Sequence, residues 1–309
     1  MFKYHTSMVK IMLFFLVSGA FVAPTASAQQ ANFSFTSKIF QESRDIVVHL
    51  PKKYNPESSE GYPVFYMLDA DQETDEIAAQ PIANAPEVIV IAIQNVRRGM
   101  DFLPHHSSVK RDEEQVFGNG GKFLSFVKDE LIPLVNKKFR TNGRQFFHGH
   151  SWAGQFVTYA LSEAPELFDG FFITSPSIGN YGEKTFENLK HVFKKQQDFP
   201  AFVYVSVGSK ERPRLLKDYE KLIELLGKHL PTQVKLVTEI NEGAIHDNSG
   251  SISIPKAMQL FFSIKPIAPA ATVAQLEGSY RAVPALKNAF FNPAPTDRKD
   301  GIEVGELGV

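Results

Sequence analysis

The sequence predicts an α/β protein with a doubly wound, mostly parallel sheet. Two observations carry this prediction. Short and almost wholly apolar segments recur along the chain, and stretches with the apolar periodicity of helices lie between them. Strands that are apolar on both faces belong to a sheet that helices cover on both sides. The alternation of strands and helices implies parallel strands joined by right-handed crossovers.

The expected elements follow one another from residue 33 onward. Residues 33–50 alternate polar and apolar side chains, which predicts an N-terminal antiparallel strand pair. Buried strands are predicted at residues 64–68, 88–93, 144–148, 171–174 and 202–207, and a strand with a more alternating pattern at residues 233–240. Helices are predicted at residues 121–136, 152–164, 213–229 and 254–264.

The two ends of the chain differ from this pattern. Residues 1–28 predict a secretory signal peptide, because Lys3 and Lys10 precede an apolar run at residues 11–17, and an Ala-Ser-Ala cleavage site ends at Ala28. The run is short for a membrane span, although an uncleaved anchor is the alternative interpretation. We therefore expect a periplasmic or secreted protein without stable membrane insertion after cleavage. One α/β domain is expected at residues 29–265, followed by a Pro- and Ala-rich, partly disordered tail at residues 266–309.

Composition narrows the classes of function. The chain has no cysteine, so it has neither disulfides nor a lipoprotein anchor. Its formal charge of −1 becomes −3 when the two leader lysines are removed. A near-neutral chain without basic blocks gives no electrostatic basis for a nucleic-acid partner.

Residues 149–154 (GHSWAG) are the most informative motif. A short apolar strand runs into Ser151, small residues flank the serine, and a helical pattern follows at once. Strand, tight turn with serine at its apex and helix together are typical of a nucleophile elbow. The small neighbours are needed because a strained turn brings the strand and the helix into close contact. The alternative is a Gly-Ser turn that only connects the two elements.

A nucleophilic serine needs a base and a carboxylate that orients the base. His246 follows the strand at residues 233–240, and Glu211 follows the strand at residues 202–207, in the order serine, acid, histidine. Both positions fall at the carboxyl edge of the sheet, where catalytic groups of open α/β sheets collect. The remaining candidates are Glu242 and Asp218 for the acid, and His105 and His106 for the base. His148 and His150 are expected to pack or to shape the site.

An oxyanion hole needs two backbone donors. We expect the amide of Trp152, directly after the serine, and the amide of Asp71, in the loop after the strand at residues 64–68. Asp69 and Asp71 are also candidate metal ligands, but no cluster at ligand spacing accompanies them, so no metal site is predicted.

At this point the chain resembles a known family. Residues 62–70 (YPVFYMLDA) resemble the YPVLYLLDG signature of an esterase family of α/β-hydrolases. That family includes enterochelin and other siderophore esterases, feruloyl esterases, S-formylglutathione hydrolase and the mycolyltransferases. Further similar segments lie at residues 89–104, 123–144 and 175–177. The resemblance extends over about residues 33–264 and is closest to the siderophore-esterase branch.

The resemblance implies an α/β-hydrolase fold and an exported serine esterase that acts on small-molecule esters through an acyl-enzyme, without a cofactor. Ala70 and Ala153 stand where the family usually has glycine, and Ala153 is expected to narrow the acyl site. An acyltransferase of the same fold and a non-catalytic binding protein are the alternatives.

Arg97 and Arg98 are candidate substrate-binding residues. They follow the strand at residues 88–93, at the sheet edge that carries the expected site. They suit an anionic or catecholate substrate, whereas the alternative is a solvated turn with surface salt bridges. The segment at residues 97–121 is charged, so we expect esters of bulky or aromatic partners to be preferred over long acyl chains.

Overall fold

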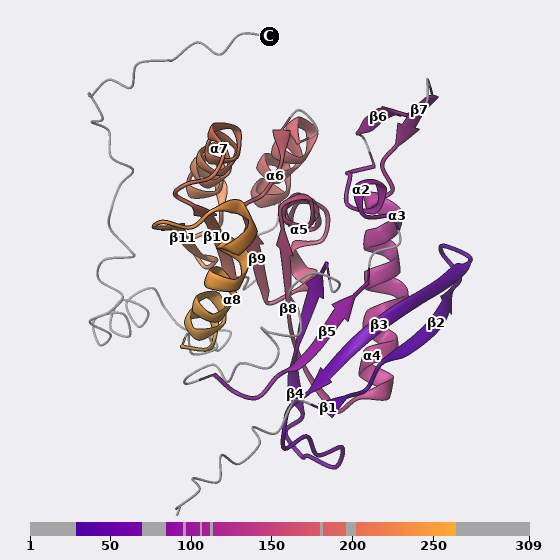
Figure 1. The fold of residues 1–309 in the computed structure, drawn as a ribbon. Coiled ribbons are helices and arrows are strands. Elements are labelled where there is room, and N and C mark those ends of the chain that lie inside the picture. Colours follow the sequence, from indigo (N-terminus) through magenta and orange to yellow (C-terminus); the bar gives the residue numbers. More distant parts are fainter. Residues whose placement is uncertain are drawn as a thin grey trace, which may run out of the picture.

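A nine-stranded sheet lies at the centre of the computed structural model (Figure 1). The structure describes residues 29–69, 85–94, 97–105, 107–111, 114–179, 182–195 and 202–263. The expected signal peptide, the expected tail from residue 266, Ala70, Asp71 and His106 lie outside the described residues.

The strand order of the sheet is β1-β3-β5-β4-β8-β9-β10-β11, and β2 pairs with β3. Pairs from β5 to β11 are parallel, and β1, β2 and β5 are antiparallel to β3. This confirms the expected mostly parallel sheet with an N-terminal antiparallel pair. The strands are β1 (Gln29–Gln30), β2 (Phe33–Ser37), β3 (Glu42–Leu50), β4 (Tyr62–Leu68), β5 (Ile89–Ile93), β8 (Thr141–His150), β9 (Gly170–Thr174), β10 (Phe202–Gly208) and β11 (Lys235–Asn241).

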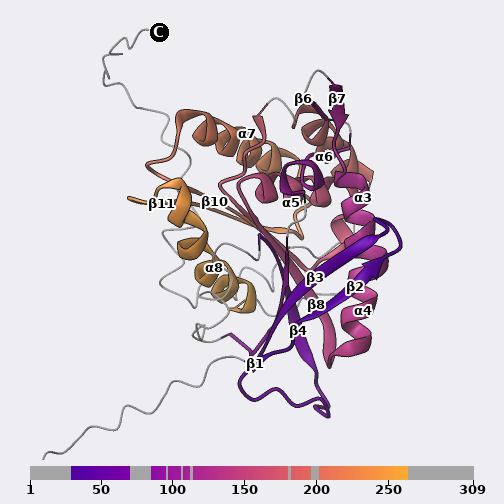
Figure 2. The ribbon, with the colours of Figure 1, turned by 45° about the vertical axis from the view of Figure 1, so that its right-hand side comes forward.

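Helices cover both faces of this sheet. Alternate residues of β4 show the two layers: Tyr66 packs into a large cluster with α5 (Trp152–Glu163), α6 (Glu183–Lys195) and α7 (Pro213–His229). Phe65 packs into a second cluster with α8 (His246–Ser263). Figure 2 shows α8 on one side of the strands and the other three helices on the opposite side. Strands covered in this way can be apolar on both faces, as the sequence predicts.

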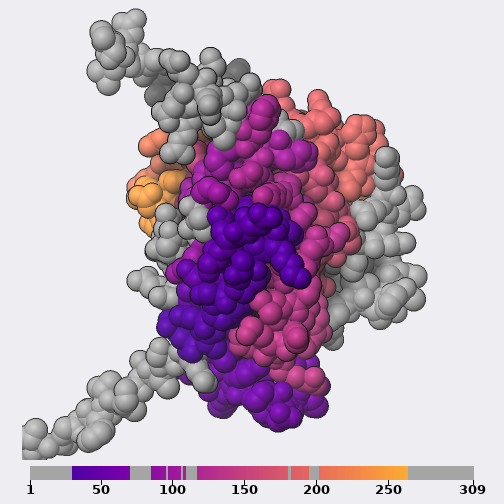
Figure 3. All heavy atoms as spheres, turned by 90° about the vertical axis from the view of Figure 1, so that its right-hand side faces the viewer, coloured from indigo at the N-terminus to yellow at the C-terminus, as the bar shows by residue number. Residues whose placement is uncertain are grey.

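The strands β2 and β3 cover the edge of the molecule beside the helical stretch that contains α3 (Gly120–Ser125) and α4 (Ile132–Lys138). Figure 3 shows these strands in indigo across that face. Arg44 of β3 is buried over the ring of Phe40, with 3.9 Å from its guanidinium carbon to the ring centroid. Its Nη1 donates to Asp101 of α2 (Arg98–Asp101) at 3.1 Å. This buried ion pair ties the N-terminal strands to the segment that follows β5.

Several elements differ from the sequence predictions. The expected helix at residues 121–136 contains a π-helix, Phe126–Leu131, which ends two residues before Pro133, and Pro133 has no N–H to donate to the preceding turn. The charged segment after α2 carries a hairpin of β6 (Ser108–Arg111) and β7 (Glu114–Phe117), where no strand was predicted. A 3₁₀ turn, Pro165–Leu167, follows α5, and α6 was not predicted as a separate element. The last helix begins at His246, eight residues before the expected start.

The turn between β8 and α5 is tight. Ser151 has φ 61° and ψ −117°, a conformation that L-residues rarely adopt. A Cβ on Gly149 would lie 2.3 Å from the carbonyl oxygen of Ala153, and a Cβ on Gly154 would lie 2.8 Å from that of Thr174. Small residues are therefore required on both sides of the serine by direct contact between strand and helix.

We expect Gly149→Ala to lower the free energy of unfolding by about 1–3 kcal/mol, because the new methyl group overlaps backbone that must shift. Urea denaturation measures this change. Gly227→Ala is the matched control, since Gly227 lies in α7 with nothing within 4 Å of an added Cβ. It should raise the free energy of unfolding by about 0.5–1 kcal/mol through helix propensity. Equal effects of the two substitutions would contradict the close-contact explanation.

Candidate active site

Ser151 stands at the carboxyl end of β8 and lines a cavity of about 420 Å³. Its own amide donates to the carbonyl of Thr174 at 3.1 Å, and its carbonyl accepts from the amide of Ser177 at 3.0 Å. These bonds hold the turn against the end of β9. The described residues that line the cavity are Ser151, Trp152, Ser177, Arg212, Arg214, Leu215, His246 and Asp247.

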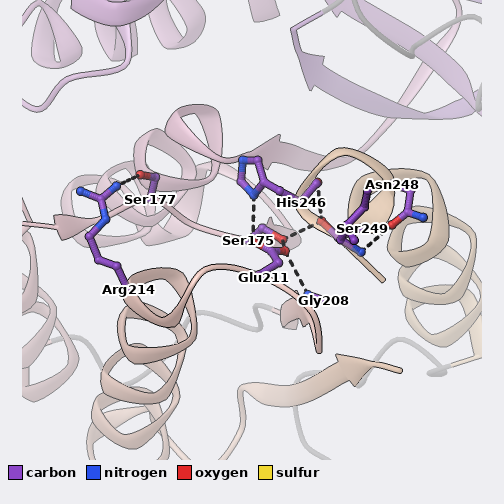
Figure 4. A network of polar contacts seen from close by, with 9 residues as sticks. Ser175, Ser177, Gly208, Glu211, Arg214, His246, Asn248 and Ser249 are labelled. Atoms are coloured by element: carbon purple, nitrogen blue, oxygen red, sulfur yellow. Dashed lines mark hydrogen bonds and ion pairs between the residues drawn. The ribbon is translucent and has the colours of Figure 1, made fainter. Parts of the chain in front are cut away.

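The second part of the site is a hydrogen bond between Glu211 and His246. The Glu211 side chain is fully buried, and its Oε2 lies 2.8 Å from His246 Nδ1 (Figure 4). Its Oε1 accepts from the amide of Gly208 at 3.0 Å and from the hydroxyl of Ser175. The carboxylate is thus held by three donors from three different segments.

The surroundings of Glu211 keep it ionised. Burial by itself raises the pKa of Glu211, but the hydrogen bonds from His246, Ser175 and Gly208 outweigh burial, so the net pKa lies below its ordinary value. An ionised carboxylate only accepts hydrogen bonds, so His246 Nδ1 carries the proton and donates to Glu211 Oε2. The Nε2 atom of neutral His246 is then left as the proton acceptor.

The start of α8 differs from the expected loop. His246 is its first residue, and Asn248 Oδ1 accepts from the amide of Ile245 at 2.9 Å. The Ser249 hydroxyl lies 2.6 Å from the Ser175 hydroxyl, and it contacts the carbonyl of His246 at 3.0 Å. Figure 4 shows the Ser175 hydroxyl between Ser249 and the Glu211 carboxylate. Contacts with the ends of β9 and β10 therefore stabilise a helical start that local propensity disfavours.

The other acid candidates lie elsewhere. Glu242 is exposed and accepts from the Ser209 hydroxyl at 3.3 Å. Asp218 lies on α7 and accepts from the amide of Gly179 at 2.9 Å. Among these three carboxylates, Glu211 is the one that contacts His246.

The other histidines contribute in different ways. His105 lies against Tyr159, with ring centroids 5.5 Å apart. His150 lies beside His246, with ring centroids 4.5 Å apart and ring planes tilted by 41°, and His148 lies two residues earlier in β8. Burial, and then the neighbouring His246, lower the pKa of His150 to about 4. Burial, and then His150, lower the pKa of His148 to about 3. Both rings are therefore uncharged near neutral pH and add no positive charge beside His246.

The amide of Trp152 is the first of α5. Amides in the first turn of a helix have no intrahelical acceptor and favour negative charge. The second expected donor, Asp71, lies outside the described residues. Asp69, at the end of β4, has φ 62° and holds Arg98 through two hydrogen bonds of 2.6 and 2.9 Å.

The arginines at the cavity are not those singled out in the sequence. Arg97 pairs with Glu42 at 3.1 Å and Arg98 pairs with Asp69, and neither lines the cavity beside Ser151. Arg212 and Arg214, at the start of α7, do line it. The sequence held a signal for them, because they directly follow Glu211 at the same strand end.

Within the described residues, no group of three or more His, Cys, Asp or Glu side chains is placed to hold a metal ion. In the same part of the chain, no helix has the length and apolar character that a membrane crossing requires.

Comparison with known proteins identifies the family. The family described as "Putative esterase" matches residues 37–248, which is more than half of the chain and includes Ser151, Glu211 and His246. The chain belongs to this esterase family.

The curated relatives and solved structures agree with this assignment. Ferri-bacillibactin esterase BesA of Bacillus subtilis (strain 168) is 28% identical over 159 residues, which are 44% of this chain and 55% of that protein. The chain thus spans about half the length of that relative. The crystal structure of the BES protein from Bacillus cereus covers 83% of this chain and 99% of its own, with 23% identity and a TM-score of 0.66. An IroE-like serine hydrolase from Shewanella oneidensis covers 82% and 86%, with 24% identity and a TM-score of 0.67. These likenesses show that the chain has the α/β-hydrolase fold.

We expect the free energy of unfolding to depend on pH, because His148 is buried. The pKa of His148 is lower in the folded protein than its value of about 6.5 in the unfolded chain, so the unfolded chain binds more protons in acid. The stability that His148 contributes is present above the unfolded pKa and is lost as the pH falls toward the folded pKa. Between pH about 7.5 and about 5 this loss should be about 1–2 kcal/mol for His148.

Denaturation at the two pH values measures the loss. His148→Gln should show a smaller fall in the free energy of unfolding than the unchanged protein. The exposed His191 on α6 is the matched control, and His191→Gln should keep the original pH dependence. An unchanged slope in His148→Gln would show that His148 is not the source.

Proposed function

We propose that the chain is an exported serine esterase in which Ser151 is the nucleophile, His246 the general base and Glu211 the carboxylate that orients His246. The observation that carries the proposal is the 2.8 Å contact between Glu211 and His246 beside a serine on a strained strand-to-helix turn, with Ser151 and His246 lining one cavity. Membership of an esterase family supports the same reaction.

The reaction follows from these positions. Ser151 Oγ attacks the ester carbonyl carbon while His246 Nε2 takes its proton, and the charge of Glu211 stabilises the imidazolium. The amides of Trp152 and Asp71 donate to the developing oxyanion. His246 then gives the proton to the departing alcohol, which leaves an acyl group on Ser151. A water molecule attacks the acyl carbon with His246 again as base, and His246 returns this proton to Ser151 Oγ as the bond between Oγ and the acyl carbon breaks, which releases the carboxylic acid.

The substrates we propose are small-molecule esters of bulky or aromatic partners, as in siderophore-like or aryl esters. Relatives named as a ferri-bacillibactin esterase and an apo-salmochelin esterase support this class. The cavity of about 420 Å³ has room for a ring, and the half-exposed Trp152 offers a surface on which a ring can stack.

Location and partners complete the proposal. The leader pattern at residues 1–28 supports export to the periplasm or the exterior. The near-neutral charge gives no support for a nucleic-acid partner.

An acyltransferase would use the same residues, with an alcohol in place of water in the second half of the reaction. Product analysis in the presence of an added acceptor alcohol separates the two activities. A binding protein without catalysis would fail to react with a fluorophosphonate, which labels an activated serine.

We expect Ser151→Ala to lower kcat on an aryl ester by about 10⁴-fold or more, because nucleophile and base act as a unit. The same variant should lose fluorophosphonate labelling while its circular dichroism spectrum stays unchanged. Retention of more than about a tenth of the original rate would remove Ser151 from the mechanism.

The acid assignment is tested by comparing two carboxylates. His246→Ala should lose nearly as much activity as Ser151→Ala, and Glu211→Gln should lose about 10²-fold less than either. Glu242→Gln is the matched control, since Glu242 is exposed and does not contact His246. It should stay within about twofold of the original kcat/KM, a difference of a few tenths of a kcal/mol. If Glu211→Gln kept the original kcat/KM and Glu242→Gln lost most of it, Glu242 and not Glu211 would be the carboxylate that orients His246.

A further inference from the structure

The cavity beside Ser151 has two arginines at one wall. Arg212 is the residue before α7 and Arg214 is the second residue of that helix, and both side chains line the cavity together with His246. Neither arginine belongs to the segments that resemble the esterase family or to the proposed catalytic residues.

Arg214 is held in place by a chain of two hydrogen bonds. Its Nη2 donates to the Ser177 hydroxyl at 3.0 Å, and the Ser177 amide donates to the carbonyl of Ser151 at 3.0 Å. Figure 4 shows the guanidinium extending from α7 to Ser177. These two hydrogen bonds connect the exposed Arg214 side chain to the backbone of the nucleophile.

The two arginines differ in their partners from the other arginines near this edge. Arg44, Arg97 and Arg98 each pair with a carboxylate. Within the described residues, neither Arg212 nor Arg214 forms an ion pair. Five donors on each guanidinium are suited to planar oxygen anions, and those of Arg212 and most of those of Arg214 are available to a ligand.

Charge in the rest of the cavity does not cancel these two cations. Asp247 is the one acidic residue among the described residues that line the cavity, and it is exposed, as are Arg212 and Arg214. The remaining lining residues, apart from His246, carry no ionisable side chain. An ester bound at Ser151 therefore meets a net positive wall at the start of α7.

We propose that Arg212 and Arg214 form an anion-recognition site that selects esters carrying a carboxylate or a similar anionic oxygen group. This inference rests on the proposed esterase function, since it names the class of substrate for the same cavity. The anion binds at the α7 wall, while the ester carbonyl lies at Ser151.

Matched pairs of esters test the proposal. One pair is the butyrate ester of 4-hydroxyphenylacetic acid and that of its amide, which differ in charge but share a similar leaving phenol. The second pair is the mono-phenyl ester of adipic acid and the phenyl ester of its monoamide, which places the charge on the acyl side. The readout is the ratio of kcat/KM for the anionic ester to that for the neutral ester in each pair.

The unchanged protein should favour the anionic member by about tenfold in at least one pair, as expected for a hydrogen-bonded charge at a partly exposed site. Arg212→Gln and Arg214→Gln should each lower that ratio, and the double variant should bring it to about one. High salt should also lower the ratio, because exposed charges are screened. Arg214→Lys should retain part of the preference, since it keeps the charge and loses the planar geometry.

Lys217→Gln is the matched control, because it removes a positive charge from an exposed position of α7 that does not line the cavity. It should keep both the ratio and the rates. A ratio near one in both pairs for the unchanged protein would overturn the proposal. So would a ratio that survives in the double variant, or one that is lost in Arg97→Gln or Arg98→Gln instead.

A chain without esterase activity would give a different result from an esterase without the anion site. In that case the unchanged protein would hydrolyse none of the four esters, and Ser151 would not react with a fluorophosphonate. Hydrolysis of the neutral esters without discrimination would overturn the anion site alone.

Discussion

The strained backbone of Ser151 is the constraint on which the rest of the site depends. A residue with φ 61° is held only when its neighbours determine the conformation from both sides. Here Thr174 accepts the Ser151 amide, and Ser177 donates to its carbonyl. Gly149 and Gly154 leave room for the crossing of strand and helix. The stability of the whole parallel sheet thus supports one unfavourable residue, and the hydroxyl stands at the cavity as a consequence.

The buried Glu211 carboxylate depends on the same sheet edge. Burial of a carboxylate is unfavourable without hydrogen bonds, and three donors supply them: Ser175 directly after β9, Gly208 of β10 and His246 at the start of α8. Removal of any one donor would raise the pKa of Glu211 and weaken its hold on His246. The neighbouring rings of His148 and His150 are kept uncharged by burial, so these two rings add no positive charge beside the imidazolium that forms on His246.

Arginines at this edge divide into two groups with different consequences. Arg44 and Arg98 pair with buried aspartates and hold β3, β4 and α2 together. Loss of one partner of such a pair strongly destabilises the folded protein, because the other charge stays buried without compensation. Arg212 and Arg214 face the cavity without a carboxylate partner among the described residues. Arginine therefore holds elements together in one part of this edge and is available for recognition at the cavity.

The sequence by itself determined the order and type of the main elements, the elbow at Ser151 and the chain order of serine, acid and histidine. These features are local: apolar periodicity, small residues around one serine, and polar residues directly after apolar strands.

Tertiary structure alone decided which carboxylate contacts His246, because Glu211 and Glu242 both follow strand ends and only their placement separates them. It also decided that α8 begins at His246, where Ser249 contacts Ser175 across the sheet edge and overrides weak local propensity. Arg97 and Arg98 form ion pairs with Glu42 and Asp69, which are distant in sequence, and Arg212 and Arg214 line the cavity beside Ser151. Contacts between residues far apart in sequence leave no local pattern, which is the physical reason why the sequence could not foretell them.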